Sequence, residues 1–185
     1  MRTSTSRKSL NRRLVVASRV MAHVILALLV LYPLLVATYS FVAPEMAALH
    51  AWTAGLEGIA VPLEPGAALC LSLGLLVAAA PGVWGLFHLR MLFLGYATGE
   101  VLTVDAAVRF NRFAQSLLVA AFAGPVGSAV TTLALSTAGW WQGGTVRVRV
   151  STEEIGLAVL GGVLMLIARV MLDAAMLAEE NSQIL

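Results

Sequence analysis

Long runs of apolar residues, separated by short polar stretches, make up most of this chain. A helix needs about 20 mainly apolar residues to cross a bilayer. Four runs meet this length, and they cover residues 20–42, 67–87, 114–138 and 155–172. The first three runs contain no charged residue, and the fourth contains only Arg169, near its end. The pattern predicts an all-α membrane protein whose four transmembrane helices form a bundle.

The composition agrees with this prediction. Hydrophobic residues make up 59% of the 185 residues and charged residues 12%, whereas a soluble domain is about 25% charged. The mean hydropathy is +0.89. With a single cysteine, a disulfide scaffold is excluded. The first apolar run is too long for the core of a signal peptide, so we expect a retained helix.

The basic residues predict an orientation, because loops rich in Lys and Arg stay in the cytoplasm. Six basic residues and no acid precede the first span, three lie in loop 88–113, and one ends the fourth span. Ten of the twelve basic residues therefore lie on one side of the membrane in this prediction. We expect a multi-pass protein of the bacterial cytoplasmic (inner) membrane with both termini cytoplasmic. Residues 1–19 would form a basic cytoplasmic tail, residues 20–185 one transmembrane domain, and residues 43–66 and 139–154 the outer loops.

Small residues recur every four positions on two of the spans. Such stripes let helix backbones approach closely in lipid, so packing within the bundle is the first expectation. A homodimer through one stripe is the alternative. The candidate packing residues are Gly74, Ala78 and Gly82 on the second span and Ala120, Gly124 and Ser128, continued by Thr132, on the third.

The two outer loops contain segments with strand-like patterns. Residues 145–150 alternate valines with Arg147 and Arg149, and residues 58–63 also place apolar side chains on one face. Alternation of period two is typical of a half-buried strand. We therefore expect a small two-stranded extracytoplasmic β cap, with Glu57 and Glu64 available to the two arginines. The adjacent Trp140 and Trp141 are expected in the aromatic belt at the membrane surface.

The inner loop contains the densest group of charged residues. Thr103 is a candidate N-cap, and Asp105, Arg109 and Arg112 follow at i, i+4 and i+7 on one helix face. Asp105 and Arg109 have the spacing of a helical ion pair. Three interpretations stay open for this face. It is a solvated helix start beside lipid headgroups, which is the first expectation, a surface that docks a protein, or a ligand site.

The start and end of the fourth span also have recognisable patterns. Ser151 to Glu154 fits the Ser-x-x-Glu capping box. Arg169 anchors the helix end at the headgroups, pairs with Asp173 or faces a partner, and anchoring is the first expectation. The chain then ends in an acidic and polar segment, Glu179, Glu180 and Asn181, on the same side as loop 88–113.

At these segments the chain resembles a bacterial membrane-protein family catalogued as domain of unknown function 2975. The family has four spans, a second-loop signature and a closing Glu-Glu-Asn. The matching residues are Gly99, Glu100, Leu102, Thr103, Arg109, Phe110, Arg112, Glu179, Glu180 and Asn181. Members are often encoded beside a very small helix-turn-helix protein of the Cro type. The resemblance thus implies a membrane-bound partner of a transcription regulator.

No catalytic constellation is present in the sequence. His23, His50 and His88 lie in separate segments without metal-ligand spacing, and Cys70 lies alone within an apolar span, as a small packing residue would. We therefore expect no enzyme, no metal, no cofactor and no direct nucleic-acid binding. The leading hypothesis is a non-enzymatic regulatory or sensory partner that docks a small cytoplasmic helix-turn-helix protein. The candidate docking residues are Glu100, Asp105, Arg109, Arg112, Glu179, Glu180 and Asn181. The alternative is a small transporter accessory subunit or pore.

Overall fold

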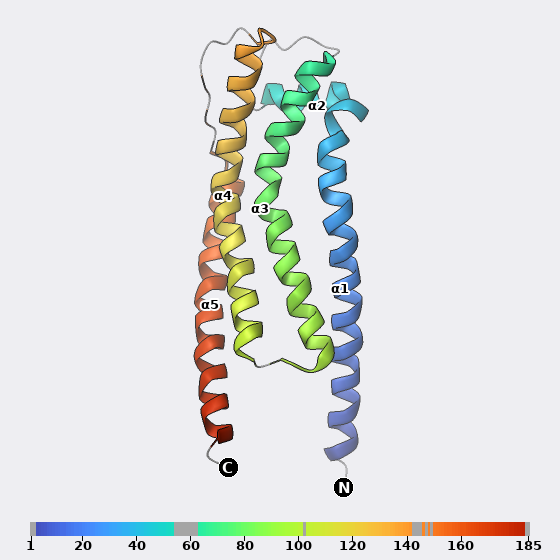
Figure 1. The fold of residues 1–185 in the computed structure, drawn as a ribbon, viewed down its shortest axis with the longest axis vertical. Coiled ribbons are helices and arrows are strands. Elements are labelled where there is room, and N and C mark those ends of the chain that lie inside the picture. Colours follow the sequence, from blue (N-terminus) through green and yellow to red (C-terminus); the bar gives the residue numbers. More distant parts are fainter. Residues whose placement is uncertain are drawn as a thin grey trace.

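The computed structural model of the chain describes residues 3–53, 63–101, 103–141, 146, 148 and 150–183. These residues form five helices and no strand (Figure 1). The helices are α1 (Thr3–Val42), α2 (Pro44–Thr53), α3 (Pro65–Thr98), α4 (Val104–Thr137) and α5 (Thr152–Gln183). All except α2 are long and apolar enough to cross a membrane. For the described residues the all-α prediction is confirmed, and so is the prediction of four helices that are long and apolar enough to span a membrane.

The helices are longer than the apolar runs that predicted them. The basic tail is not a separate segment, because α1 continues through it from Thr3. In the same way α3 and α4 extend into the expected inner loop, so that only residues 99–103 separate them. Polar side chains are compatible with a helix, so the helical conformation continues past the apolar run until a residue such as Gly99 ends the helix. Hydropathy therefore marks the apolar part of each helix but not its ends.

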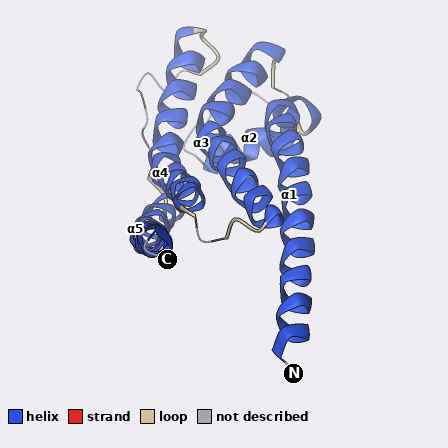
Figure 2. Ribbon diagram, turned by 60° about the horizontal axis from the view of Figure 1, so that its bottom comes forward, coloured by secondary structure: helices blue, strands red, loops and turns tan. Residues whose placement is uncertain are grey.

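The four long helices lie in a row in the order α1, α3, α4, α5 (Figure 2). Each packs on its neighbours in this order, and among the described residues no extensive contact joins α5 to α1 or α3. The helices at the two ends of the row, α1 and α5, therefore each have a long neighbouring helix on one side only. Only 11% of the apolar window of α1 or α5 is buried, against 39% for α3 and 28% for α4.

The backbones of α3 and α4 approach most closely at two glycines. A β-carbon on Gly127 would lie 2.7 Å from the carbonyl oxygen of Gly74, and one on Gly74 would overlap Thr131. Closer to the turn that joins α3 to α4, a β-carbon on Gly85 would overlap Ser116. Small residues therefore do line this contact, as the stripe on the second span predicted. Gly127 and Thr131, its partners on α4, were not predicted.

The other predicted packing residues have different neighbours. Ala78 lies at the same contact, 3.1 Å from the β-carbon position of Gly127, and Gly82 faces Tyr32 of α1 at 3.8 Å. Gly124 faces α5, where a β-carbon would lie 2.6 Å from Glu154 Oε1. The small residues of α3 and α4 are thus used within the chain. Ala120 and Ser128 are half-buried on α4.

Two tryptophans close the end of the row opposite to both chain termini, which we call the Trp end. Gly139, with φ of 77°, ends α4 and lets Trp140 N donate to the carbonyl oxygen of Leu135 at 3.0 Å. Trp140 Nε1 donates to Glu64 Oε2 at 2.9 Å, and its ring lies over Gly66. Any side chain at residue 66 would collide with this ring. The contact ties the start of α3 to the end of α4.

Trp141 corrects one expectation. It is 4% exposed and packs in a core cluster with Ala51 of α2, Ala67 and Leu71 of α3, and Leu135 of α4. Trp141 is therefore a packing residue at the junction of three helices, not a residue of a lipid-facing belt. Cys70 packs against the same cluster, as expected of a small apolar filler. Of the two segments expected to form the β cap, 58–63 and 145–150, residues 58–62, 145, 147 and 149 lie outside the described residues.

Candidate functional site: the turn between α3 and α4

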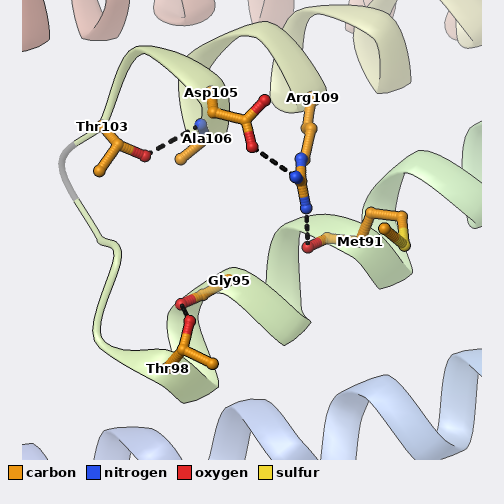
Figure 3. Close-up of polar contacts among 7 residues, drawn as sticks. All are labelled: Met91, Gly95, Thr98, Thr103, Asp105, Ala106 and Arg109. Carbon is orange, nitrogen blue, oxygen red and sulfur yellow. Dashed lines mark hydrogen bonds and ion pairs between the residues drawn. The ribbon is translucent and has the colours of Figure 1, made fainter.

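The turn between α3 and α4 is fixed at both of its ends (Figure 3). Gly99 has φ of 95°, a left-handed conformation that side chains other than glycine rarely adopt. Gly99 N donates to Tyr96 O at 3.2 Å and Glu100 N to Gly95 O at 3.0 Å. This pair of bonds is a Schellman motif, which satisfies the last carbonyl groups of a helix. We call the end of the row that carries this turn the turn end.

Thr103 begins α4 as the sequence predicted. Its Oγ1 accepts a hydrogen bond from Ala106 N at 3.2 Å, so Thr103 is the N-cap. Asp105 lies in the first turn, where the helix dipole favours a negative charge. Both helix ends at the turn are therefore capped by local interactions that the sequence encodes.

Arg109 joins the two helices at this turn. It forms an ion pair with Asp105, as its i,i+4 spacing predicted. Its Nη1 also donates to Met91 O of α3 at 2.8 Å (Figure 3). The arginine side chain is 27% exposed and that of Asp105 is 62% exposed. Arg109 is therefore a structural clasp, while the outer side of Asp105 stays accessible.

The bond to Met91 was not predicted, and no sequence signal could have revealed it. Every residue has a carbonyl oxygen, so the identity of residue 91 says nothing about this contact. Arg109, Asp105 and Glu100 also line a shallow crevice with Met91 and Gly95. This crevice has no room for a water-sized molecule. It is a packed junction and not a small-molecule pocket.

The remaining candidate docking residues are exposed at the same end. Glu100, Arg112, Glu179 and Glu180 all have exposed side chains, whereas the side chain of Asn181 lies outside the described part. A β-carbon on Gly161 would lie 3.1 Å from Ala114 O, which sets the antiparallel register of α5 on α4. In this register Ala174 is level with Val104. Glu179 and Glu180 therefore lie beyond the turn, and both α1 and α5 extend past it (Figure 1).

All four long helices place arginine at one level near the turn end. Arg90 is next to Met91, which Arg109 bonds. The register of α5 puts Arg169 level with Arg109, and the contact of Gly82 with Tyr32 puts Arg19 about one helical turn away. We call this set, completed by Arg112, the arginine level. Arg169 and Asp173 are both exposed, and no ion pair joins them. Anchoring at the headgroups and contact with a partner are the interpretations of Arg169 that stay predictions.

His88 lies just inside the arginine level and is 8% exposed. Its ring is edge-on to Trp84 and Phe87, with centroids 5.4 and 5.5 Å away. Within the part of the chain that the structure describes, no three His, Cys, Asp or Glu side chains gather to hold a metal ion. His88 is thus a packed histidine between aromatic rings.

No protein-family model, no curated protein and no solved structure matches this chain.

Proposed function

We propose that this chain is a non-enzymatic regulatory partner that docks a small soluble protein at its turn end. The partner we propose is a small helix-turn-helix regulator, as the resemblance to domain of unknown function 2975 implies. In this proposal the chain resides in the bacterial cytoplasmic membrane, and its turn end and both termini face the cytoplasm. An extracytoplasmic β cap of residues 58–63 and 145–150 belongs to the same proposal.

The arginine level supports the orientation. Arginine enrichment at one height is typical of the cytoplasmic boundary of a membrane protein. Among the described residues, Glu45 and Glu64 lie at the Trp end and no arginine does. In this part of the chain the two ends of the row therefore differ in charge in the sense that the positive-inside rule describes.

One observation carries the docking proposal: charges of both signs are exposed at the turn end, near a turn whose two flanking helix ends are capped. Glu100 and Arg112 project beside a segment fixed by the Schellman motif, the Thr103 cap and the Arg109 clasp. Because the helix ends on both sides of the turn are already held in place, a partner that binds them loses little conformational entropy. Charged groups on an ordered surface select a partner by electrostatic complementarity.

The proposal is tested by co-purification of the tagged full-length chain in detergent. We expect a small helix-turn-helix protein to be enriched with the wild-type chain. The double variant Glu100→Arg, Arg112→Glu should reduce this enrichment about tenfold, a loss of about 1.4 kcal/mol. The control is Arg169→Gln, which lies at the same level on α5 and should retain the partner.

The proposal fails if no DNA-binding protein is enriched, or if the double variant captures as much as the wild type. The same preparation, reconstituted into vesicles, distinguishes the alternative of a transporter accessory subunit or pore. Solute flux that requires this chain alone would favour that alternative.

A further inference from the structure

Arg90 lies on the side of α3 that packs against α1. About three and five helical turns before it, on the same line of the helix, come the buried residues Ala79 and Ser72. Ala78 touches α4 at Gly127, and Ala79 is turned by about 100° from that contact. Because α1 is the other long neighbour of α3, the line of Ser72 and Ala79 faces α1, and Arg90 continues this line.

The register of the two helices places Arg90 beside the buried face of α1. Gly82 faces Tyr32 at 3.8 Å, and α1 and α3 run in opposite directions (Figure 1). Arg90 is nearer to the turn than Gly82, and it is therefore level with the segment between Ala22 and Ile25, both of which are buried. In this position the arginine is half-buried.

The guanidinium group of Arg90 has no counter-charge among the described residues. Its Nε atom is buried and lacks a hydrogen-bond partner in this part of the chain. The sequences of α1 and α3 contain no Asp or Glu, whereas α1 contains five basic residues. Asp105 and Glu100 line the junction around Arg109, on the α4 side of α3. A buried, unpaired donor of a charged group is costly, and an anion bound here would supply both the acceptor and the negative charge.

Arg19 and His23 of α1 flank the same place, and both are exposed. The buried Ala22 marks the line of α1 that faces α3. Tyr32 lies to one side of this line, and Arg19 and His23 lie to the other. Arg90 is turned by about 80° around α3 from the residue that Tyr32 touches, which brings it towards Arg19 and His23. His23 Nδ1 donates to Arg19 O at 2.7 Å and holds the imidazole ring beside this group.

The stripe of α1 that begins with Arg19 and His23 continues into the apolar part of the helix. Leu26 and Val30 follow at helical spacing, and they are 41% and 60% exposed. Basic groups at the height of the headgroups, followed by an exposed apolar stripe, match the phosphate and the acyl chain of a phospholipid. A free phosphate ion would use only the basic groups, and a soluble acidic protein would not reach the apolar stripe.

We propose that Arg19 and Arg90 bind the phosphate group of an anionic phospholipid where α1 packs on α3, with an acyl chain along Leu26 and Val30. The forked donors of a guanidinium group match the oxygen atoms of a phosphate. Basic pockets between transmembrane helices bind lipid headgroups in this way. This site is separate from the docking surface at Arg112, and the inference does not depend on the docking function.

The site is tested by native mass spectrometry of the full-length chain released from detergent, which counts the lipids that stay bound. Phosphatidylglycerol, phosphatidylcholine or inorganic phosphate is added to the wild type and to the single variants Arg19→Gln and Arg90→Gln. Two controls remove the same charge elsewhere. Arg13→Gln lies on α1 on the side opposite to Ala22, and Arg169→Gln lies at the arginine level on α5.

We expect the wild type to retain phosphatidylglycerol in preference to phosphatidylcholine. Arg19→Gln and Arg90→Gln should each weaken the binding of phosphatidylglycerol at least about fivefold. The two controls should stay within about twofold of the wild type, because their charges are distant from the site and screened. Inorganic phosphate at the same concentration should not displace the lipid.

Equal losses in all four variants would show attraction to the net charge alone, and the proposed site would be wrong. The same conclusion follows if neither Arg19→Gln nor Arg90→Gln weakens binding, or if inorganic phosphate displaces the lipid as well as added lipid does. Because Arg19 is exposed, its variant decides the question even where Arg90→Gln does not fold.

Discussion

At the scale of single residues, Arg109 and Arg112 have different roles although both were candidates for docking. Arg109 is occupied by Asp105 and by the carbonyl oxygen of Met91. Arg112 is exposed one helical turn further along α4. We therefore expect substitution of Arg109 to change stability and substitution of Arg112 to change partner binding.

We expect Arg109→Gln to lower the free energy of unfolding by about 1.5 to 3 kcal/mol, the range for a hydrogen bond to a charged group. The ion pair with Asp105 adds little, because Asp105 is mostly exposed. Arg112→Gln should leave stability within about 0.5 kcal/mol of the wild type. Thermal unfolding in detergent measures both, and equal stability of the two variants would refute the clasp.

Gly99 gives a second prediction at this scale. Its φ of 95° strains any side chain, so Gly99→Ala should destabilise the protein by about 1 kcal/mol or more. Gly162 is the matched control, since it lies within α5 with nothing within 4 Å of its β-carbon position. Gly162→Ala should be neutral or stabilising by up to about 1 kcal/mol. We expect the melting temperature to fall for Gly99→Ala and to stay the same or rise for Gly162→Ala.

Contacts between residues close in sequence were predictable, because helix geometry fixes their distance. The Thr103 cap, the Asp105–Arg109 pair and the capping box at Ser151 are all of this kind. The bond of Arg109 to Met91 and that of Trp140 to Glu64 depend on which helices are neighbours. Trp141 failed as a prediction for the same reason, since hydropathy cannot tell a buried tryptophan from one facing headgroups.

At the scale of elements, the contact of α3 with α4 depends on the absence of side chains at Gly74 and Gly127. Their backbones come close enough that a β-carbon on either would be crowded by the other helix. The recurrence of small residues predicted the α3 side of this contact. The α4 partners were missed, because Gly124 and Gly127 are both small, and spacing alone does not say which of them faces α3 and which faces α5.

This contact is tested by Gly74→Ile. The larger side chain must push the helices apart, which costs about 1 to 3 kcal/mol in a well-packed site. Gly156→Ile is the control, because a β-carbon on Gly156 of α5 has nothing within 4 Å. We expect the melting temperature in detergent to fall for Gly74→Ile alone. A comparable loss in both variants would show that the cost arises from the helix backbone and not from the contact.

At the scale of the whole molecule, the open row places both termini, the turn and the arginine level at one end (Figure 1). The four long helices and their order along the chain were predictable from apolar runs. The row itself was not, because hydropathy does not report which helices touch. Neither was the shift of α5 towards the turn end, since it depends on the contact of Glu154 with Gly124.

The topology is tested with reporter fusions. A reporter active only in the cytoplasm should be active after residue 185 and at Gly99, and inactive at Gly139. A reporter active only outside the cytoplasm should give the opposite pattern. Cytoplasmic activity at Gly139 would reverse the orientation and remove the basis for a cytoplasmic docking surface.

The most direct test of the docking function is photocrosslinking in intact cells. A photoreactive amino acid replaces either Arg112 at the turn end or Phe122, an exposed residue in the apolar part of α4. The docking function predicts a covalent adduct between residue 112 and a small helix-turn-helix protein, identified by mass spectrometry, and no such adduct from residue 122. Adducts with lipid alone at residue 112, or the same protein captured equally at both positions, would contradict it.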